Sequence, residues 1–216
     1  MTGNCYRTPK KIEFSSNLHG TNKNEMISSI DTIGIALDTS GSMNSILSNV
    51  CMETIGILET YNPKEVVFCQ FSNKIECSRL SMEESIEKIK KVNANGSTAM
   101  FDGVTTMLHE LISIASTGKK NVLAVIVSDG LENSSVEFRK QDLINAKTKL
   151  RELVGDDCIR EICISTTLQE ARTLQISTPG LRRDCSAKAT RDPVSIRNAF
   201  RSMSHPMSTQ RVLFDD

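Results

Sequence analysis

The stretch Ile33–Met43, IGIALDTSGSM, decides how this chain folds. An apolar run ends at Asp38, and the hydroxyl residues Ser40 and Ser42 follow closely after it. The apolar part has no helical period, so residues 31–38 are predicted to form a buried strand. A carboxylate and two hydroxyls directly after a buried strand make up half of a possible oxygen-ligand set, and other segments of the chain supply similar groups.

The length and charge of the chain favour one globular domain. The chain has 216 residues, 26 of them Lys or Arg and 26 Asp or Glu, and 38% are hydrophobic, which is enough for a core. A formal net charge of zero removes the electrostatic case for binding nucleic acid. We expect residues 30–205 to form the domain, between a polar amino-terminal extension, 1–29, and a carboxyl-terminal tail, 206–216.

The cysteines and the apolar segments bear on location. The first residues carry no apolar segment typical of a secretory signal, and no run approaches the roughly 20 apolar residues of a membrane span. The seven cysteines are odd in number and several fall inside predicted strands or helices, which is typical of reduced thiols. We therefore expect a cytoplasmic protein without a membrane partner. The absence of a C-x-x-C pair disfavours zinc.

Strands and helices alternate along the chain. Apolar runs predict strands at residues 31–38, 65–71, 75–80, 121–130 and 160–165, and the more polar stretch 181–189 is predicted to form a sixth strand. The turn before the third of these strands is so short that it must pair antiparallel with the second. Apolar residues three and four positions apart predict helices between the other strands. This alternation favours an α/β domain with a mostly parallel sheet covered on both faces.

Three helix starts carry capping signals. Ser81 and Glu84 form a capping box, S-x-x-E, and the same pattern at 134–137 is predicted to open the helix after the fourth strand. Asp192 is predicted to cap a last helix that begins at Pro193.

Polar side chains lie at the ends of two predicted strands and before one helix. Asp38, Ser40 and Ser42 follow the first strand, Asp129 follows the fourth in VIVSDG, and Thr98 in GST precedes the third helix. In open α/β sheets, ligands bind beyond the carboxyl ends of the strands, where the strand order reverses. If the first and fourth strands are neighbours, these five side chains meet at one edge of the sheet.

The chemistry of these side chains points to a hard divalent cation. All the donors are oxygens, which selects Mg²⁺, Mn²⁺ or Ca²⁺ over zinc or copper, and small hydroxyls on short loops suit the octahedral shell of Mg²⁺. Two aspartates balance one divalent cation and leave the site near neutral. Such a cation would attract one more carboxylate from outside. We therefore expect a protein partner that presents Asp or Glu to the metal.

The pattern D-x-S-x-S at Asp38, Ser40 and Ser42, with Thr98 in GST and Asp129 in SDG, resembles the metal-ion-dependent adhesion site of von Willebrand factor A domains. The resemblance covers the whole predicted domain and is to the small intracellular bacterial and phage members. It implies a six-stranded sheet in the order 3-2-1-4-5-6, with strand 3 antiparallel and helices on both faces. It also implies that the two serines and the threonine are metal ligands, that the aspartates act directly or through water, and that the domain binds proteins without catalysing a reaction.

Two other interpretations of these residues stay open. The DTSGS segment alone is compatible with a turn in which Ser42 caps a helix. The alternative function is a Mg²⁺-dependent phosphatase-like enzyme with Asp38 as its nucleophile. Phosphatases that place an Asp after the first strand need a second acid two residues later, and that position holds Ser40.

Overall fold

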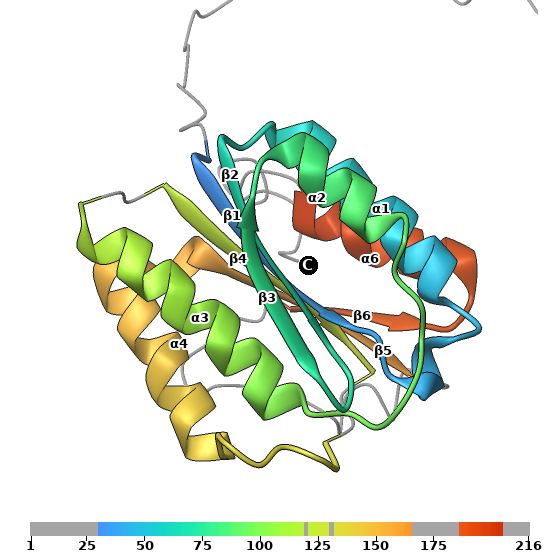
Figure 1. Cartoon of the computed structure of the whole chain (residues 1–216). Helices are drawn as coiled ribbons and strands as arrows, with labels where there is room; N and C mark the ends of the chain where they lie inside the picture. The colour runs from blue at the N-terminus through green and yellow to red at the C-terminus, as the bar shows by residue number, and fades with distance from the viewer. Residues whose placement is uncertain (1–29, 119–120, 130–131, 166–185, 205–216) are drawn as a thin grey trace, which may run out of the picture.

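The computed structural model of the chain describes residues 30–118, 121–129, 132–165 and 186–204. A sheet forms the middle layer, and helices cover both of its faces (Figure 1). The elements in chain order are β1 (Thr32–Asp38), η1 (Gly41–Met43), α1 (Leu47–Tyr61), β2 (Glu65–Phe71), β3 (Ile75–Leu80), α2 (Met82–Ile89), α3 (Met100–Ser116), β4 (Val122–Ser128), α4 (Lys140–Val154), η2 (Asp156–Cys158), β5 (Ile159–Ser165), β6 (Ser186–Thr190) and α6 (Pro193–Ser204).

The sheet has six strands in the order β3-β2-β1-β4-β5-β6. Strand β3 pairs antiparallel with β2, and every other neighbouring pair is parallel. Both the order and the single antiparallel strand confirm the predicted fold. Of the strand predicted at 181–189, residues 186–189 lie in β6, and 181–185 fall outside the described residues.

The two central strands are buried on both faces. Every residue of β1 and β4 is buried. Successive side chains of a strand point to opposite faces, so Ile33, Ile35 and Leu37 pack toward α1 and α6, whereas Ala36 packs toward α3 and α4. The sheet is thus held between two apolar cores, and the polar residues that end β1 and β4 emerge only at its carboxyl edge.

The helix starts confirm one predicted capping box and contradict the other. The Ser81 N–H donates to Glu84 Oε2 at 2.9 Å, and Glu84 N–H donates to Ser81 Oγ at 3.2 Å. The box predicted at Ser134 and Glu137 is wrong, because α4 begins only at Lys140. The Glu137 N–H that the cap needs donates instead to the carboxylate of Asp102, at 3.1 Å. A tertiary hydrogen bond has replaced the local one.

The last helix begins as predicted. The Ser195 N–H donates to Asp192 Oδ2 at 2.8 Å, which makes Asp192 the cap. The helix packs against α1 and β6, and it buries Ile196, Ala199, Phe200 and Met203. The corner between β6 and α6 is therefore fixed at the same edge of the sheet as the end of β1.

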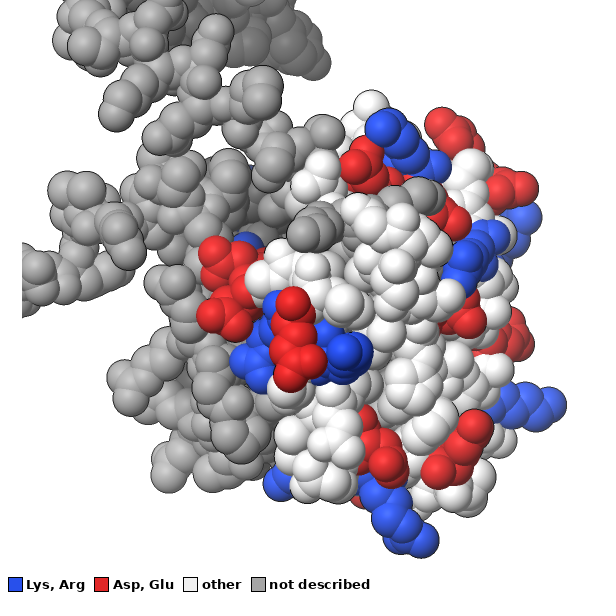
Figure 2. All heavy atoms as spheres, turned by 90° about the vertical axis from the view of Figure 1, so that its left-hand side faces the viewer, with Lys and Arg blue, Asp and Glu red and all other residues white. Residues whose placement is uncertain are grey.

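Charges of both signs are mixed on the surface. Figure 2 shows the face that lies at the left of Figure 1, and on it acidic and basic side chains are interspersed among neutral ones. This even distribution agrees with the formal net charge of zero. In the part of the chain that the structure describes, no helix combines the length and the apolar character needed to cross a bilayer.

Candidate metal centre

The loop after β1 brings its two serine hydroxyls together. The Ser40 N–H donates to Asp38 Oδ1 at 2.9 Å, which is the turn that an aspartate favours two residues before a backbone donor. The Ser40 and Ser42 Oγ atoms lie 3.0 Å apart and share a hydrogen bond. We call residues 38–42 the Asp–Ser loop. Its carboxylate and hydroxyls are joined by these hydrogen bonds into one group of oxygens. The loop itself lies at the lower right of Figure 1, where the chain leaves β1.

A second loop packs directly against the Asp–Ser loop. The Gly41 N–H donates to the Gly96 carbonyl at 3.0 Å, and a Cβ on Gly41 would lie 3.3 Å from that oxygen. The Asn95 N–H donates to the Thr39 carbonyl at 2.9 Å. Glycine at position 41 therefore permits this close approach, which places the segment leading to Thr98 beside the Asp–Ser loop.

Thr98 is held by the segment that follows β4. Thr98 is only 2% exposed. Its N–H donates to Asn133 Oδ1 at 2.8 Å, and its carbonyl accepts from the N–H groups of Asn133 and Ser134. Asn133 did not figure in the sequence prediction, because nothing in the sequence pairs it with a residue 35 positions earlier.

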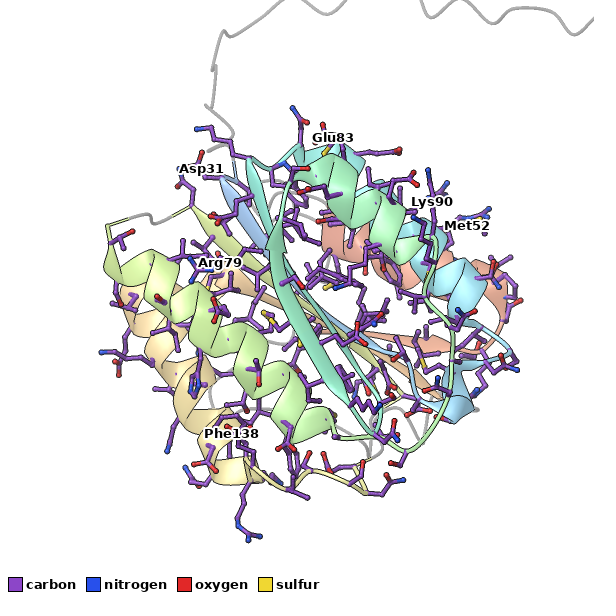
Figure 3. The ribbon with its side chains drawn as sticks, viewed as in Figure 1. Asp31, Met52, Arg79, Glu83, Lys90 and Phe138 are labelled. Carbon is purple, nitrogen blue, oxygen red and sulfur yellow. The ribbon has the colours of Figure 1, made fainter. Side chains whose placement is uncertain are left out.

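Two carboxylates near the site, those of Asp102 and Glu132, connect the start of α3 to the segment that follows β4. Both are engaged in hydrogen bonds with backbone N–H groups. Asp102 accepts the N–H groups of three consecutive residues, Val136, Glu137 and Phe138. Glu132 accepts the Phe101 N–H at 2.9 Å and hydrogen bonds from 134 and 135. The Phe138 ring, labelled in Figure 3, belongs to this segment. It packs edge-on against His109 of α3, with ring centroids 5.3 Å apart. These contacts fix the start of α3, which follows Thr98.

Asp38 is buried and held from two strands. It has no exposed surface, and its Oδ2 accepts a 2.8 Å hydrogen bond from Ser128 Oγ at the end of the neighbouring strand β4. Burial raises the pKa of Asp38 above its ordinary value, the hydrogen bonds from Ser40 and Ser128 oppose that rise, and the charge of Asp129 adds to it. The sequence prediction did not include Ser128, although it stands directly before Asp129.

Asp129 meets a cation from the far edge of the sheet. It is 2% exposed, and its Oδ2 lies 3.3 Å from Arg191 Nη2. The Nη1 of Arg191 donates to the Ser42 carbonyl at 2.6 Å. Arg191 follows β6 directly, and the sequence prediction did not include it, because a guanidinium offers no acceptor atom to a metal. Its position directly after the last strand places it at this edge of the sheet, but nothing in the sequence pairs it with Asp129.

Hydrogen bonds therefore connect the segments that carry all five predicted site residues. Asp38, Ser40 and Ser42 are linked by direct hydrogen bonds, Asp129 is linked to Ser42 through Arg191, and Thr98 lies in the adjoining loop. Among the described residues, no group of three or more His, Cys, Asp and Glu side chains could hold a metal. A cation at this edge would thus depend on hydroxyls together with two carboxylates. The role of these residues as ligands stays a prediction.

The strand order, the single antiparallel strand and the polar loop after the central strand define the class of protein: the chain has a von Willebrand factor A fold. Solved structures with this fold superpose on it. The vWF domain of the type V pili tip protein Mfa5 from Porphyromonas gingivalis has a TM-score of 0.59 and 9% identity, over 80% of this chain and 93% of that one.

Two further structures extend the comparison. The manganese-loaded TRAP protein of Plasmodium vivax has a TM-score of 0.52 and 15% identity, over 82% of this chain and 74% of its own. Proximal thread matrix protein 1 from the mussel byssus has a TM-score of 0.56 and 15% identity, over 80% of this chain and 44% of its own. This chain thus spans less than half of the mussel protein. No family model and no curated protein matches it.

Proposed function

We propose that this chain is a protein-binding domain that holds Mg²⁺ at the carboxyl edge of its sheet. In this proposal Ser40, Ser42 and Thr98 are metal ligands, Asp38 and Asp129 act directly or through water, and an Asp or Glu of a partner protein completes the shell. The observation that carries the proposal is the serine pair, with oxygens 3.0 Å apart beside two buried carboxylates. Neighbouring oxygens in an octahedral Mg²⁺ shell of radius about 2.1 Å also lie about 3.0 Å apart.

The donor set supports a partner's carboxylate as the remaining ligand. Two carboxylates with neutral hydroxyls offset the charge of one divalent cation without exceeding it, so an incoming anion is not repelled. A bound cation would supply a Lewis-acidic centre for that anion. The protein's own contribution is to fix the hydroxyls and carboxylates through the hydrogen bonds of Ser128, Gly41 and Asn133. Mn²⁺ and Ca²⁺ suit the same hard oxygens, and the manganese-loaded relative in fold supports a divalent cation.

The geometry favours binding over phosphoryl transfer. A nucleophilic Asp38 would have to reach its substrate, yet it has no exposed surface, and its oxygens accept hydrogen bonds from Ser40 and Ser128. The position two residues later is a serine, which cannot serve as the general acid. The same buried carboxylate is well placed to support a cation.

Calorimetric titration of Mg²⁺ and Mn²⁺ tests the metal site. We expect binding near one equivalent to the wild type and none to Asp38→Asn. The matched control is Asp31→Asn, the same chemical change at the opposite end of β1, where Asp31 forms an ion pair with Lys64 at 2.7 Å (Figure 3). The control should bind like the wild type. A wild type that binds neither cation, or an Asp38→Asn variant that binds both normally, would contradict the proposal.

Selection from a random peptide library tests the partner chemistry. Peptides retained in Mg²⁺ and released by EDTA are expected to share an Asp or Glu. Replacing that residue by Asn or Gln should abolish binding, because the amide cannot supply the anionic ligand. Peptides that bind equally well in EDTA, or that tolerate the amide, would count against a metal completed by a partner's carboxylate.

A further inference from the structure

Arg191 places a positive charge inside the candidate metal centre. Its Nη2 lies 3.3 Å from Asp129 Oδ2, and its Nη1 donates to the Ser42 carbonyl at 2.6 Å. The guanidinium therefore bridges two of the three segments that supply the proposed ligands, the Asp–Ser loop and the residue after β4. Its side chain is 30% exposed, whereas that of Asp129 is 2% exposed. The arginine thus reaches the buried carboxylate from the solvent side.

The backbone that presents Arg191 is held in place. The Thr190 N–H donates to Ser195 Oγ at 3.0 Å, and the Ser195 N–H donates to Asp192 Oδ2 at 2.8 Å. One turn later, Ile196 is wholly buried against the sheet. Because the β6–α6 corner is closed by these contacts, the guanidinium approaches Asp129 from a defined direction.

A guanidinium and a divalent cation on the same carboxylate oppose each other. Both gain energy from the negative charge of Asp129, and two positive charges a few ångströms apart repel each other strongly away from bulk water. A hydrogen bond to a charged group is also about twice as strong as a neutral one. Binding of a metal by Asp129 therefore costs Arg191 a strong hydrogen bond. Partial exposure gives the released guanidinium access to water.

We propose that Arg191 is an internal cation of the site that competes with the divalent metal for Asp129 and so sets the metal affinity. The inference rests on the proposed function, since it concerns the same metal. In the metal-free site the arginine offsets one of the two carboxylate charges, and metal binding exchanges that internal cation for an external one. The opposite role, in which Arg191 only positions Asp129 for the metal, predicts the opposite effect of removing it.

Metal affinity measured on Arg191→Gln tests this inference. Calorimetric titration of Mg²⁺ should give a dissociation constant about tenfold tighter than in the wild type, because both the competing hydrogen bond and the charge repulsion are gone. Arg197→Gln is the matched control. It removes the same charge from α6, where Arg197 forms an ion pair with Glu53 of α1 at 3.1 Å. Because that pair is exposed, the variant should keep the Mg²⁺ affinity within about twofold of the wild type.

A charge-preserving variant completes the test. Arg191→Lys should bind Mg²⁺ within about threefold of the wild type, because it keeps the competing charge. Unchanged or weaker binding in Arg191→Gln would overturn the inference, and so would equal tightening in Arg197→Gln. If neither the wild type nor Arg191→Gln binds Mg²⁺ or Mn²⁺, the metal proposal itself is wrong. That result differs from one in which both proteins bind the metal with equal affinity, which would overturn only the role of Arg191.

Discussion

Asp38 combines complete burial with a negative charge, and few side chains do so without a partner of opposite sign. Its hydrogen bonds from the Ser40 N–H and Ser128 Oγ offset only part of the desolvation, as its raised pKa indicates. In the metal-free protein this carboxylate therefore opposes folding, and a bound cation would remove that penalty. Side chains that serve binding often lower the stability of the protein in this way.

Asp38→Asn is expected to fold in EDTA with a free energy of unfolding equal to that of the wild type or up to about 2 kcal/mol higher. The amide removes the buried charge, can still accept the Ser40 N–H, and can donate to Ser128 Oγ. Urea unfolding in EDTA measures the difference. A loss of more than about 2 kcal/mol would show that the carboxylate supports the fold itself.

The sequence identified the five candidate ligands because each stands at the end of a strand or before a helix in a recognisable motif. It could not identify Ser128 as the partner of Asp38, nor Arg191 as the partner of Asp129. Those contacts join residues 90 and 62 positions apart, and they follow from the order of the strands rather than from any local pattern. Polar contacts of this kind become visible only when the sheet is assembled.

At the scale of elements, short sequence motifs predicted the structure correctly where an element depends only on residues close to it in the chain. The antiparallel β3 and the capping box at Ser81 needed only a short turn and a four-residue motif. The box predicted at Ser134 failed because Asp102, on a different helix, takes the backbone donor that the cap requires. The first helix begins only at Leu47, since Met43 lies in the short η1 turn that ends the Asp–Ser loop.

Helix α3 sits unusually close to β2, and Gly103 makes this possible. A Cβ at that position would lie 2.4 Å from the Phe71 Cβ, an atom fixed to the strand backbone. We expect Gly103→Ala to lower the free energy of unfolding by about 2 kcal/mol through overpacking, despite the better helix propensity of alanine.

Gly56→Ala provides the matched comparison. Gly56 lies inside α1, and a Cβ there would meet nothing within 4 Å. The same substitution should therefore raise the free energy of unfolding by about 0.5–1 kcal/mol. Urea denaturation of both variants measures the two effects. Equal changes in the two variants would show that α3 and β2 are packed less tightly than the structure indicates.

At the scale of the whole molecule, the sheet order matches the order that the family resemblance implies. Strand and helix alternation alone would have allowed several orders of a parallel sheet, and the D-x-S-x-S motif selected one. The domain limits at residues 30 and 205, and the cytoplasmic location, stay predictions.

Metal should stabilise the entire domain, because the proposed ligands come from segments that meet only in the folded state. At Mg²⁺ concentrations about 100 times the dissociation constant, the free energy of unfolding should rise by about 2.7 kcal/mol. For a domain of this size that corresponds to an increase in Tm of about 5–10 °C. Differential scanning calorimetry with Mg²⁺ and with EDTA measures it. Asp38→Asn should show no shift, and an equal shift in that variant would indicate binding elsewhere.

The central position of β1 in the sheet also has a consequence for folding during synthesis. β1 pairs with β2 soon after it in the chain, but its other edge pairs with β4, which starts only at Val122. On the ribosome, the strand that ends in Asp38 therefore waits for about 90 further residues with one edge unpaired, and unpaired strand edges attract other chains. We therefore expect the nascent amino-terminal half to be prone to association with other chains until β4 has been synthesised.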